Sequence, residues 1–236
     1  MAQSVGNAKN ILVGASPLFL SNVDINDSDY IANAEAGVAI ASGANTVGVP
    51  AFSPGASYAT TLNNVNQTAG LFGYRNVGFT NNGLQITYNP TFDSVTVDQL
   101  LDTAKLFKSA MEVMIATEMS EGTLENIVTV FGQSSSTLSA VTGTSTTTKQ
   151  ELGLAAGSLG AAPTERQLIA VGQAPTAGST SSERVYYARR VLSVQQSQHS
   201  LARTTATTFP VTFRLLPDAN YSGSEYGKII DRVLVV

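Results

Sequence analysis

The sequence predicts a mainly β, antiparallel protein with one flanking α-helix and long extended loops. Several segments alternate apolar and polar residues with the period of two that is typical of half-buried strands. A single segment combines helical spacing with start and stop signals. Long stretches rich in Ser, Thr, Asn and Gly separate these elements, and such stretches predict loops.

Composition excludes several classes of protein. A chain of 236 residues buries enough surface to fold without a disulfide or a metal. It has no cysteine, which excludes thiol catalysis, iron–sulfur clusters, thiolate zinc sites and a disulfide scaffold. Charged residues make up only 13%, and the net charge is -4. We therefore expect a surface that contacts copies of itself, and no basic patch for nucleic acid.

The apolar run from Ile11 to Leu20 predicts the first strand. Lys9 precedes this run, as a basic residue does in a signal peptide, but Gly14, Ser16 and Pro17 interrupt it. The run is also much shorter than the roughly 18 apolar residues of a membrane helix, so we expect no membrane segment.

The segment 21–74 is a long uncharged excursion. Positions 36–74 contain no charged residue, yet apolar residues recur through them, whereas a solvated loop normally carries charge. We expect a neighbouring subunit to order this segment, although a flexible loop is the alternative interpretation. The expected inter-subunit residues are Phe52, Tyr58, Leu62 and Phe72.

Strands are expected again from Arg75 to Asn89, with Thr80-Asn81-Asn82-Gly83 as a hairpin turn, because Asn and Gly tolerate positive φ. Further strands are predicted over 92–101, 107–119, 184–194 and 206–216. In the last of these, one face is apolar at every second residue: Phe209, Val211, Phe213 and Leu215.

The one predicted helix follows Ser120 or Thr123, either of which can cap it, and Gly132 ends it. Its apolar residues are expected to pack on a sheet as core: Leu124, Ile127, Val128 and Phe131. After the helix, 134–148 hold eleven Ser or Thr in fifteen positions. This composition predicts an exposed connection at about 133–150.

No motif predicts a catalytic centre, a cofactor or a metal. His199 is the only histidine, and the chain has no G-x-S-x-G elbow for a catalytic serine. The glycines at 153, 157 and 160 lack the Gly-Lys-Ser/Thr of a phosphate loop. Between Asp24 and Glu35 the spacing resembles a calcium loop, but Asp29 stands where a glycine is required, so a turn is the better interpretation.

Three carboxylates could in principle perform acid–base chemistry: Asp93, Asp98 and Asp102. Nothing in the surrounding sequence suggests a desolvated pocket that would separate their pKa values. We interpret the three aspartates as part of a negative surface.

Two blocks of the chain carry a family resemblance through the order and spacing of their motifs. The first runs from Asn76 to Tyr88, through Val95-Thr-Val-Asp-Gln99, to Thr117-Glu-Met-Ser-Glu-Gly-Thr-Leu-Glu-Asn-Ile-Val128. The second is Phe209-Pro-Val-Thr-Phe-Arg-Leu-Leu-Pro-Asp218, followed by 226–232. Together with the opening strand, they cover about half of the chain. They resemble the major tail tube protein of long-tailed, siphovirus-like bacteriophages.

The resemblance implies a single domain over 1–236 that forms an antiparallel β-sandwich or barrel with one flanking helix. It also implies hexameric rings stacked into a tail tube, the conduit for DNA ejection, in a virion made in the host cytoplasm. Partners would be a tape-measure protein and tail terminator or distal tail proteins, while DNA passes without specific binding. The alternatives are another structural protein (capsid, decoration or adhesin-like) and, more remotely, a hydrolase using Asp93, Asp98 or Glu118.

Strand parity then suggests a conduit wall. It places Asp98 and Asp102 with Ser94 and Thr96 on one face, and Val95 and Val97 toward the core. An acidic wall would repel phosphates, whereas Lys or Arg would retain them through counterion release.

Overall fold

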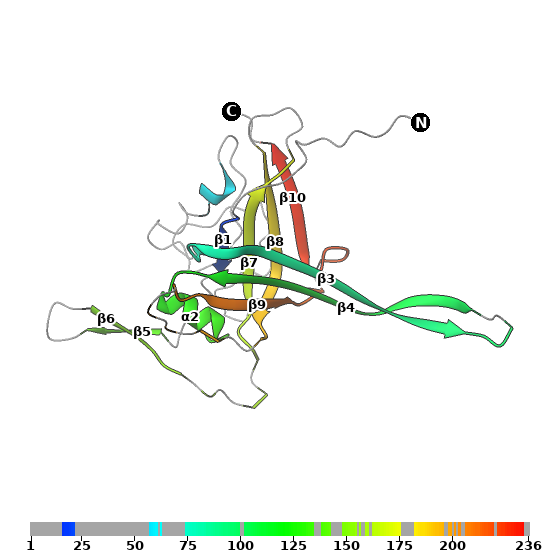
Figure 1. The fold of residues 1–236 in the computed structure, drawn as a ribbon, viewed down its shortest axis with the longest axis horizontal. Coiled ribbons are helices and arrows are strands. Elements are labelled where there is room, and N and C mark those ends of the chain that lie inside the picture. Colours follow the sequence, from blue (N-terminus) through cyan, green and yellow to red (C-terminus); the bar gives the residue numbers. More distant parts are fainter. Residues whose placement is uncertain are drawn as a thin grey trace.

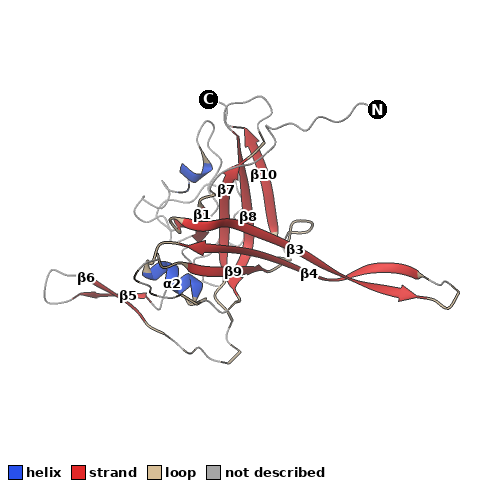
Figure 2. Ribbon diagram, viewed as in Figure 1, coloured by secondary structure: helices blue, strands red, loops and turns tan. Residues whose placement is uncertain are grey.

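The computed structural model describes residues 16–21, 57–60, 62, 74–99, 102–134, 138–142, 148–154, 156, 159–160, 162–175, 182–195, 198–199, 201, 203, 206–219 and 221–233. These residues form a mainly antiparallel β structure, which confirms the predicted fold class (Figures 1 and 2). Eight strands make one sheet in the order β2-β1-β7-β8-β9-β4-β3, with β10 also paired to β8. The strands are β1 (Leu18–Ser21), β2 (Tyr74–Asn76), β3 (Thr80–Thr96), β4 (Thr103–Met119), β7 (Arg166–Gln173), β8 (Ser182–Ser193), β9 (Phe209–Leu215) and β10 (Gly227–Val233).

Strand β8 is the branch point of the sheet. Its first part, from Ser182 to Ala188, pairs with β10, and its last part, from Val191 to Ser193, pairs with β9. Because β7 occupies the other edge of β8, β9 and β10 follow one another along the same edge. In Figure 1, β7, β8 and β10 run upright, while β9, β4 and β3 run across them. The sheet therefore divides at β8 into two parts that diverge in direction.

Strand β7 is buried on both faces, which explains its continuous apolar run. Leu168 and Ala170 belong to the larger core, together with residues of β4, β9 and helix α2 (Leu124–Val130). Ile169 and Val171 face the opposite way and pack with Tyr58 and other residues of a second core. This part of the sheet is thus the centre of a layered structure.

The excursion 21–74 contributes to this second core. Tyr58 and Leu62 are fully buried against their own chain, so the prediction that they contact another subunit is wrong. The backbone N–H of Tyr58 donates to the Glu183 carboxylate at 2.9 Å, and Glu183 also pairs with Arg232 at 2.8 Å. Two other expected contact residues, Phe52 and Phe72, and the segment 24–35 lie outside the described residues.

Helix α2 begins after Thr123, whose hydroxyl accepts the N–H of Asn126, and it ends before Gly132, as predicted. Its buried side chains include Asn126, which accepts a hydrogen bond from Arg75 of β2. Val128 is a core residue as expected, while Leu124 and Ile127 are half-buried. Phe131 is exposed, so its assignment to the core is wrong; it follows the last helical turn and lies outside the packed face.

Two predicted loops have a different structure. Thr80–Gly83 is not a hairpin turn but part of β3, where the register with β4 shifts between Asn81 and Gln85. Asn82 and Gly83 have the positive φ expected of them, and these two extra residues form a bulge instead of reversing the chain. The Ser/Thr-rich connection at about 133–150 contains β5 (Leu138–Thr142), which pairs with β6 (Thr148–Leu152).

Candidate functional site

The most unusual feature of the molecule is an arm that projects from the sheet. Strands β3 and β4 form one long hairpin, and its distal half extends beyond every other described element (Figure 1). We call residues 91–110 the arm. Every described residue in this range is exposed, on both faces of the hairpin. The predicted strands at 92–101 and 107–119 are therefore the two sides of one hairpin, with its turn near Asp98.

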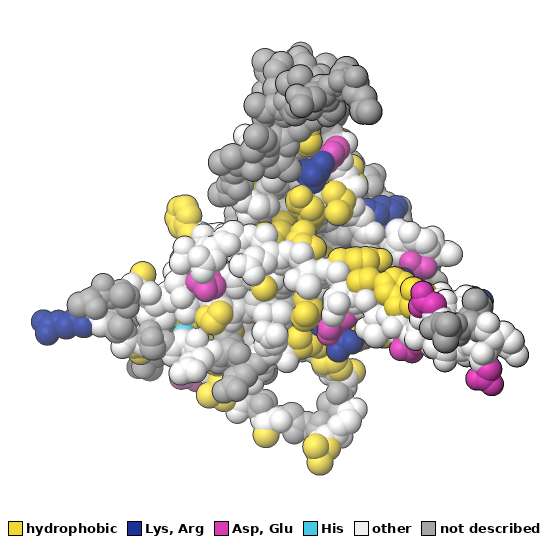
Figure 3. Space-filling model, turned by 45° about the vertical axis from the view of Figure 1, so that its right-hand side comes forward, with side chains coloured by type: hydrophobic (Ala, Val, Ile, Leu, Met, Phe, Trp, Pro, Cys, Tyr) yellow, Lys and Arg dark blue, Asp and Glu magenta, His cyan; other side chains and the backbone are white. Residues whose placement is uncertain are grey.

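The arm carries apolar side chains that water would not favour. Phe92 is 57% exposed and Leu106 is 65% exposed, and Val95 and Phe107 are exposed as well. Figure 3 shows hydrophobic side chains on the arm and where it joins the body. An isolated two-stranded hairpin is only marginally stable in water, and large apolar patches usually mark interaction sites. The arm thus has the character of an interface without its partner.

The register defines the two faces of the arm. Phe92 lies opposite Lys108 and Ser94 opposite Leu106, so these four residues share one face, which we call the apolar face. On the other face, Asp93 lies opposite Phe107 and Val95 opposite Lys105. By strand parity the apolar face continues toward the body through Tyr88 and Ile86.

The predicted conduit-wall residues all lie on the arm or its tip. Ser94 and Thr96 are exposed on β3, whereas Asp98 is in the turn and Asp102 directly precedes β4. Strand parity therefore does not extend to the two aspartates. Asp102 accepts a hydrogen bond from the Thr103 N–H at 2.7 Å.

Val95 and Val97 are exposed, so the expectation that they face the core is wrong. The physical reason is that the arm extends past the sheet, and no described core lies beneath it.

The structure does not bring the proposed hydrolase carboxylates together. Asp93 lies opposite Phe107, and Glu118 is eleven residues further along the extended strand β4. At the usual rise per residue, this separation is about 36 Å. Within the described residues no group of three or more metal-ligating side chains occurs, and His199 instead contacts the ring of Phe209, with 4.8 Å between centroids. None of the helices in that part of the chain is long and apolar enough to cross a membrane.

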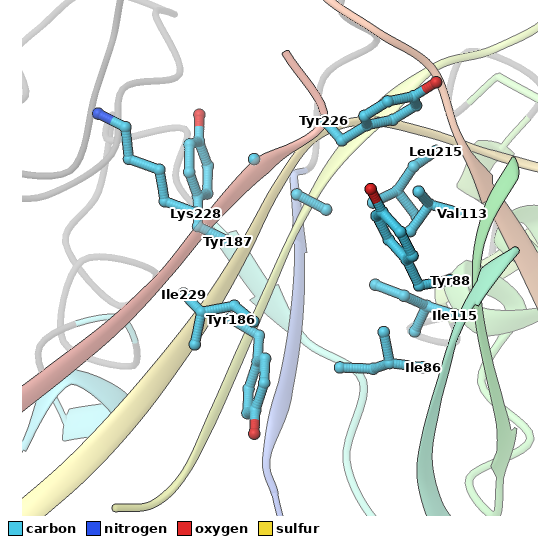
Figure 4. A pocket seen from close by; sticks show the side chains of 12 residues that line it. Ile86, Tyr88, Val113, Ile115, Tyr186, Tyr187, Leu215, Tyr226, Lys228 and Ile229 are labelled. Carbon is cyan, nitrogen blue, oxygen red and sulfur yellow. The ribbon is translucent and has the colours of Figure 1, made fainter. Parts of the chain in front are cut away.

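An apolar groove lies where the arm joins the body. It lies between the diverging parts of the sheet and has a volume of about 290 Å³. Ile86, Tyr88, Val113 and Ile115 of the hairpin form one wall, and Tyr186 and Ile229 form the other (Figure 4). The lysine at its edge, Lys228, points away from it in the same view. The groove is therefore lined almost entirely by apolar side chains and tyrosine rings.

Charged groups lie beside the groove. Asp231 follows Ile229 on the same face of β10 and accepts two hydrogen bonds from Arg184, at 2.5 and 2.7 Å. This pairing lowers the pKa of Asp231, which keeps its carboxylate ionised. The pKa of Glu225 is also lowered, chiefly by the N–H of Gly223 and to a smaller extent by Lys108 of the arm.

Comparison of the sequence with protein families found no match, and comparison with curated proteins found none either. The arm and the groove are the features that sequence reasoning missed. Apolar residues at both strand parities between 92 and 107 were the available signal for the arm, because a strand with one buried face shows them at only one parity.

Proposed function

We propose that this protein is a structural subunit that assembles with copies of itself into stacked hexameric rings, as the tail tube of a long-tailed bacteriophage. In this role it acts as a conduit for DNA in the virion and not as an enzyme. The tape-measure protein and the tail terminator or distal tail proteins would be its further partners.

The observation that carries this proposal is the exposed apolar arm. A monomer that exposes aromatic and aliphatic side chains on a two-stranded projection is at risk of aggregation unless an ordered partner covers them. Low surface charge removes the repulsion that would keep copies apart, since charged residues make up only 13% of the chain. The motif order described above supports a tube in preference to other assemblies.

The decisive experiment compares the full chain with a variant that lacks the arm. Thr91 lies opposite Ala110, so residues 92–109 can be replaced by Asn-Gly, which forms a tight turn between facing strands. We expect the full chain to form rings and tubes by electron microscopy and sedimentation. The variant should fold with a similar melting temperature and stay monomeric.

The result also separates this function from the other structural roles. Closed shells or free trimers would favour a capsid, decoration or adhesin-like protein. A full chain that stays monomeric at high concentration would overturn the proposal, and so would a variant without the arm that forms normal tubes.

A further inference from the structure

We infer that the apolar groove between β10 and the root of the hairpin receives the arm of a second copy of this chain, with Phe92 and Leu106 inside it. This inference rests on the proposed function and names the contact that would propagate the assembly. Each copy offers one arm and one groove.

The sizes and chemistry of the two surfaces match. The groove has a volume of about 290 Å³ and presents isoleucine, valine and tyrosine side chains. A cavity of about 150 Å³ is enough to hold a benzene molecule, so the ring of Phe92 and the side chain of Leu106 can enter together. On the arm these two side chains share a face. Leu106 lies opposite Ser94, and Ser94 is two residues from Phe92 on the same strand.

The occupant must come from another copy. The groove wall includes Ile86 and Tyr88, which belong to the root of the same hairpin as the arm. The arm leaves this root in an extended conformation and points away from the body (Figure 1), so it does not reach back into its own groove. The same two surfaces can meet when they belong to different copies.

Charge supports the same orientation. Lys108 lies opposite Phe92, and it is the only charged residue among the four that define the apolar face. The groove is flanked by Asp231, whose side chain is half exposed although it is paired with Arg184. A neighbour's arm that places Phe92 against Ile229 therefore brings Lys108 toward the ion pair of Asp231 with Arg184, in which the carboxylate is more exposed (51%) than the guanidinium (24%).

The contact is head-to-tail, because the tip of an arm and a groove are different surfaces. Head-to-tail contacts form closed rings or open helical arrays, whereas a reciprocal exchange of arms would stop at a dimer. This difference provides a direct test.

The test uses the absence of cysteine from the chain. A double variant, Ser94→Cys with Asp231→Cys, places one thiol on the apolar face of the arm and one beside the groove, on the same face of β10 as Ile229. With a short bifunctional thiol cross-linker, we expect a ladder of covalent species that continues beyond the dimer. Ser94→Cys with Leu201→Cys is the matched control, because Leu201 is exposed but lies outside both surfaces, and it should give a ladder at least about fivefold weaker.

A second measurement identifies the face of the arm that docks. Phe92→Ser and Leu106→Ser should each raise the protein concentration needed for assembly about tenfold or more, since burying such a side chain is worth about 1.5–3 kcal/mol. Phe107→Ser, on the opposite face, should change it by less than about threefold.

The outcomes separate this inference from the proposed function. Tubes that form normally while the double variant gives only the control's weak ladder would overturn the docking site and leave the tube intact. A ladder that stops at the dimer would overturn the head-to-tail contact, and equal effects of Phe92→Ser and Phe107→Ser would overturn the choice of face. If the wild-type chain stays monomeric, both proposals are wrong.

Discussion

Tyr88 lies directly opposite Val113 across the β3–β4 ladder, yet Tyr88 is 66% exposed and Val113 only 7%. The two side chains share a face, so their difference in exposure arises from the positions of their strands in the sheet. Strand β4 is covered by the core beneath it and by β9, while β3 lies at the edge of the sheet. One residue pair therefore marks the boundary between the part of the hairpin that stabilises the fold and the part available to a partner.

This boundary predicts opposite effects of two substitutions. Val113→Ala should lower the free energy of unfolding by about 1–3 kcal/mol, because it removes buried methyl groups from a packed site. Tyr88→Ala should change it by less than about 0.5 kcal/mol and should weaken assembly. Chemical denaturation and sedimentation measure the two effects separately. A Tyr88→Ala variant as destabilised as Val113→Ala would contradict this division.

Gly227 allows β10 to approach β8 closely. Its φ is +146°, and a Cβ at this position would lie 1.9 Å from the carbonyl oxygen of Tyr187. We expect Gly227→Ala to destabilise the fold by about 2 kcal/mol or more, because both the backbone strain and the clash must be relieved. Thermal unfolding measures this loss.

Gly223→Ala is the matched control for that substitution. Gly223 also has positive φ, +82°, but no atom of the described residues lies within 4 Å of the position that its Cβ would take. The cost should then be only the conformational strain of about 1–2 kcal/mol. Equal losses for the two variants would show that the close approach to β8 has no energetic weight.

Arg190 and Arg184 form pairs of similar geometry but different burial. Arg190 donates to Glu165 at 2.6 and 2.9 Å, and the Glu165 side chain is almost fully buried, whereas Asp231 beside Arg184 is half exposed. Arg190→Met should lower the free energy of unfolding by about 2–3 kcal/mol, because it leaves the buried Glu165 carboxylate without this partner. The loss is moderated because Arg190 itself is partly exposed to water. Arg184→Met should cost less than about 1 kcal/mol. Urea unfolding measures both losses, and a larger loss for Arg184→Met than for Arg190→Met would contradict the role given to burial.

Tyr58 should make the fold sensitive to alkaline pH. Burial, followed by the charge of Tyr187, raises the pKa of Tyr58 above its ordinary value of 10.0. The folded chain therefore holds this proton more tightly than the unfolded chain. The resulting stability is fully present below pH 10 and is lost as the pH rises from 10 toward the folded pKa.

Arg75 acts in the opposite direction, since burial lowers its pKa from 12.5 to about 10 and its contribution to stability increases over that range. The comparison of wild type with Tyr58→Phe isolates the tyrosine. Between pH 9 and 11 the Tyr58→Phe variant should lose less stability than the wild type. Parallel curves for wild type and Tyr58→Phe would contradict the assignment.

Local signals in the sequence predicted the elements that depend on local physics. Thr123 and Gly132 mark the two ends of α2, because capping groups act within one turn. Alternation over 209–215 predicted β9 and its buried face. Strand β7 was missed because both of its faces are buried, so its sequence does not alternate.

The arm and groove depended on information that a local pattern does not contain. The Asn82-Gly83 pair predicts positive φ, but the position of the chain reversal depends on the pairing of β3 with β4 over their full lengths. The groove needs Ile86, Val113 and Ile229 together, which only the branching of the sheet at β8 achieves. Burial of Tyr58 was likewise unpredictable, because most of the strand residues in its core cluster, such as Ile169 and Val185, lie more than 100 residues later in the chain.

The order of the strands along the chain sets a sequence of events during synthesis. The arm is complete once residue 110 has been made, whereas one wall of the groove belongs to β10, which begins at Gly227. A nascent chain on the ribosome therefore has an arm to present long before it has a groove to receive one. Under the arm-in-groove contact proposed above, neighbouring nascent chains cannot dock on one another, and growth of the proposed assembly waits for finished subunits.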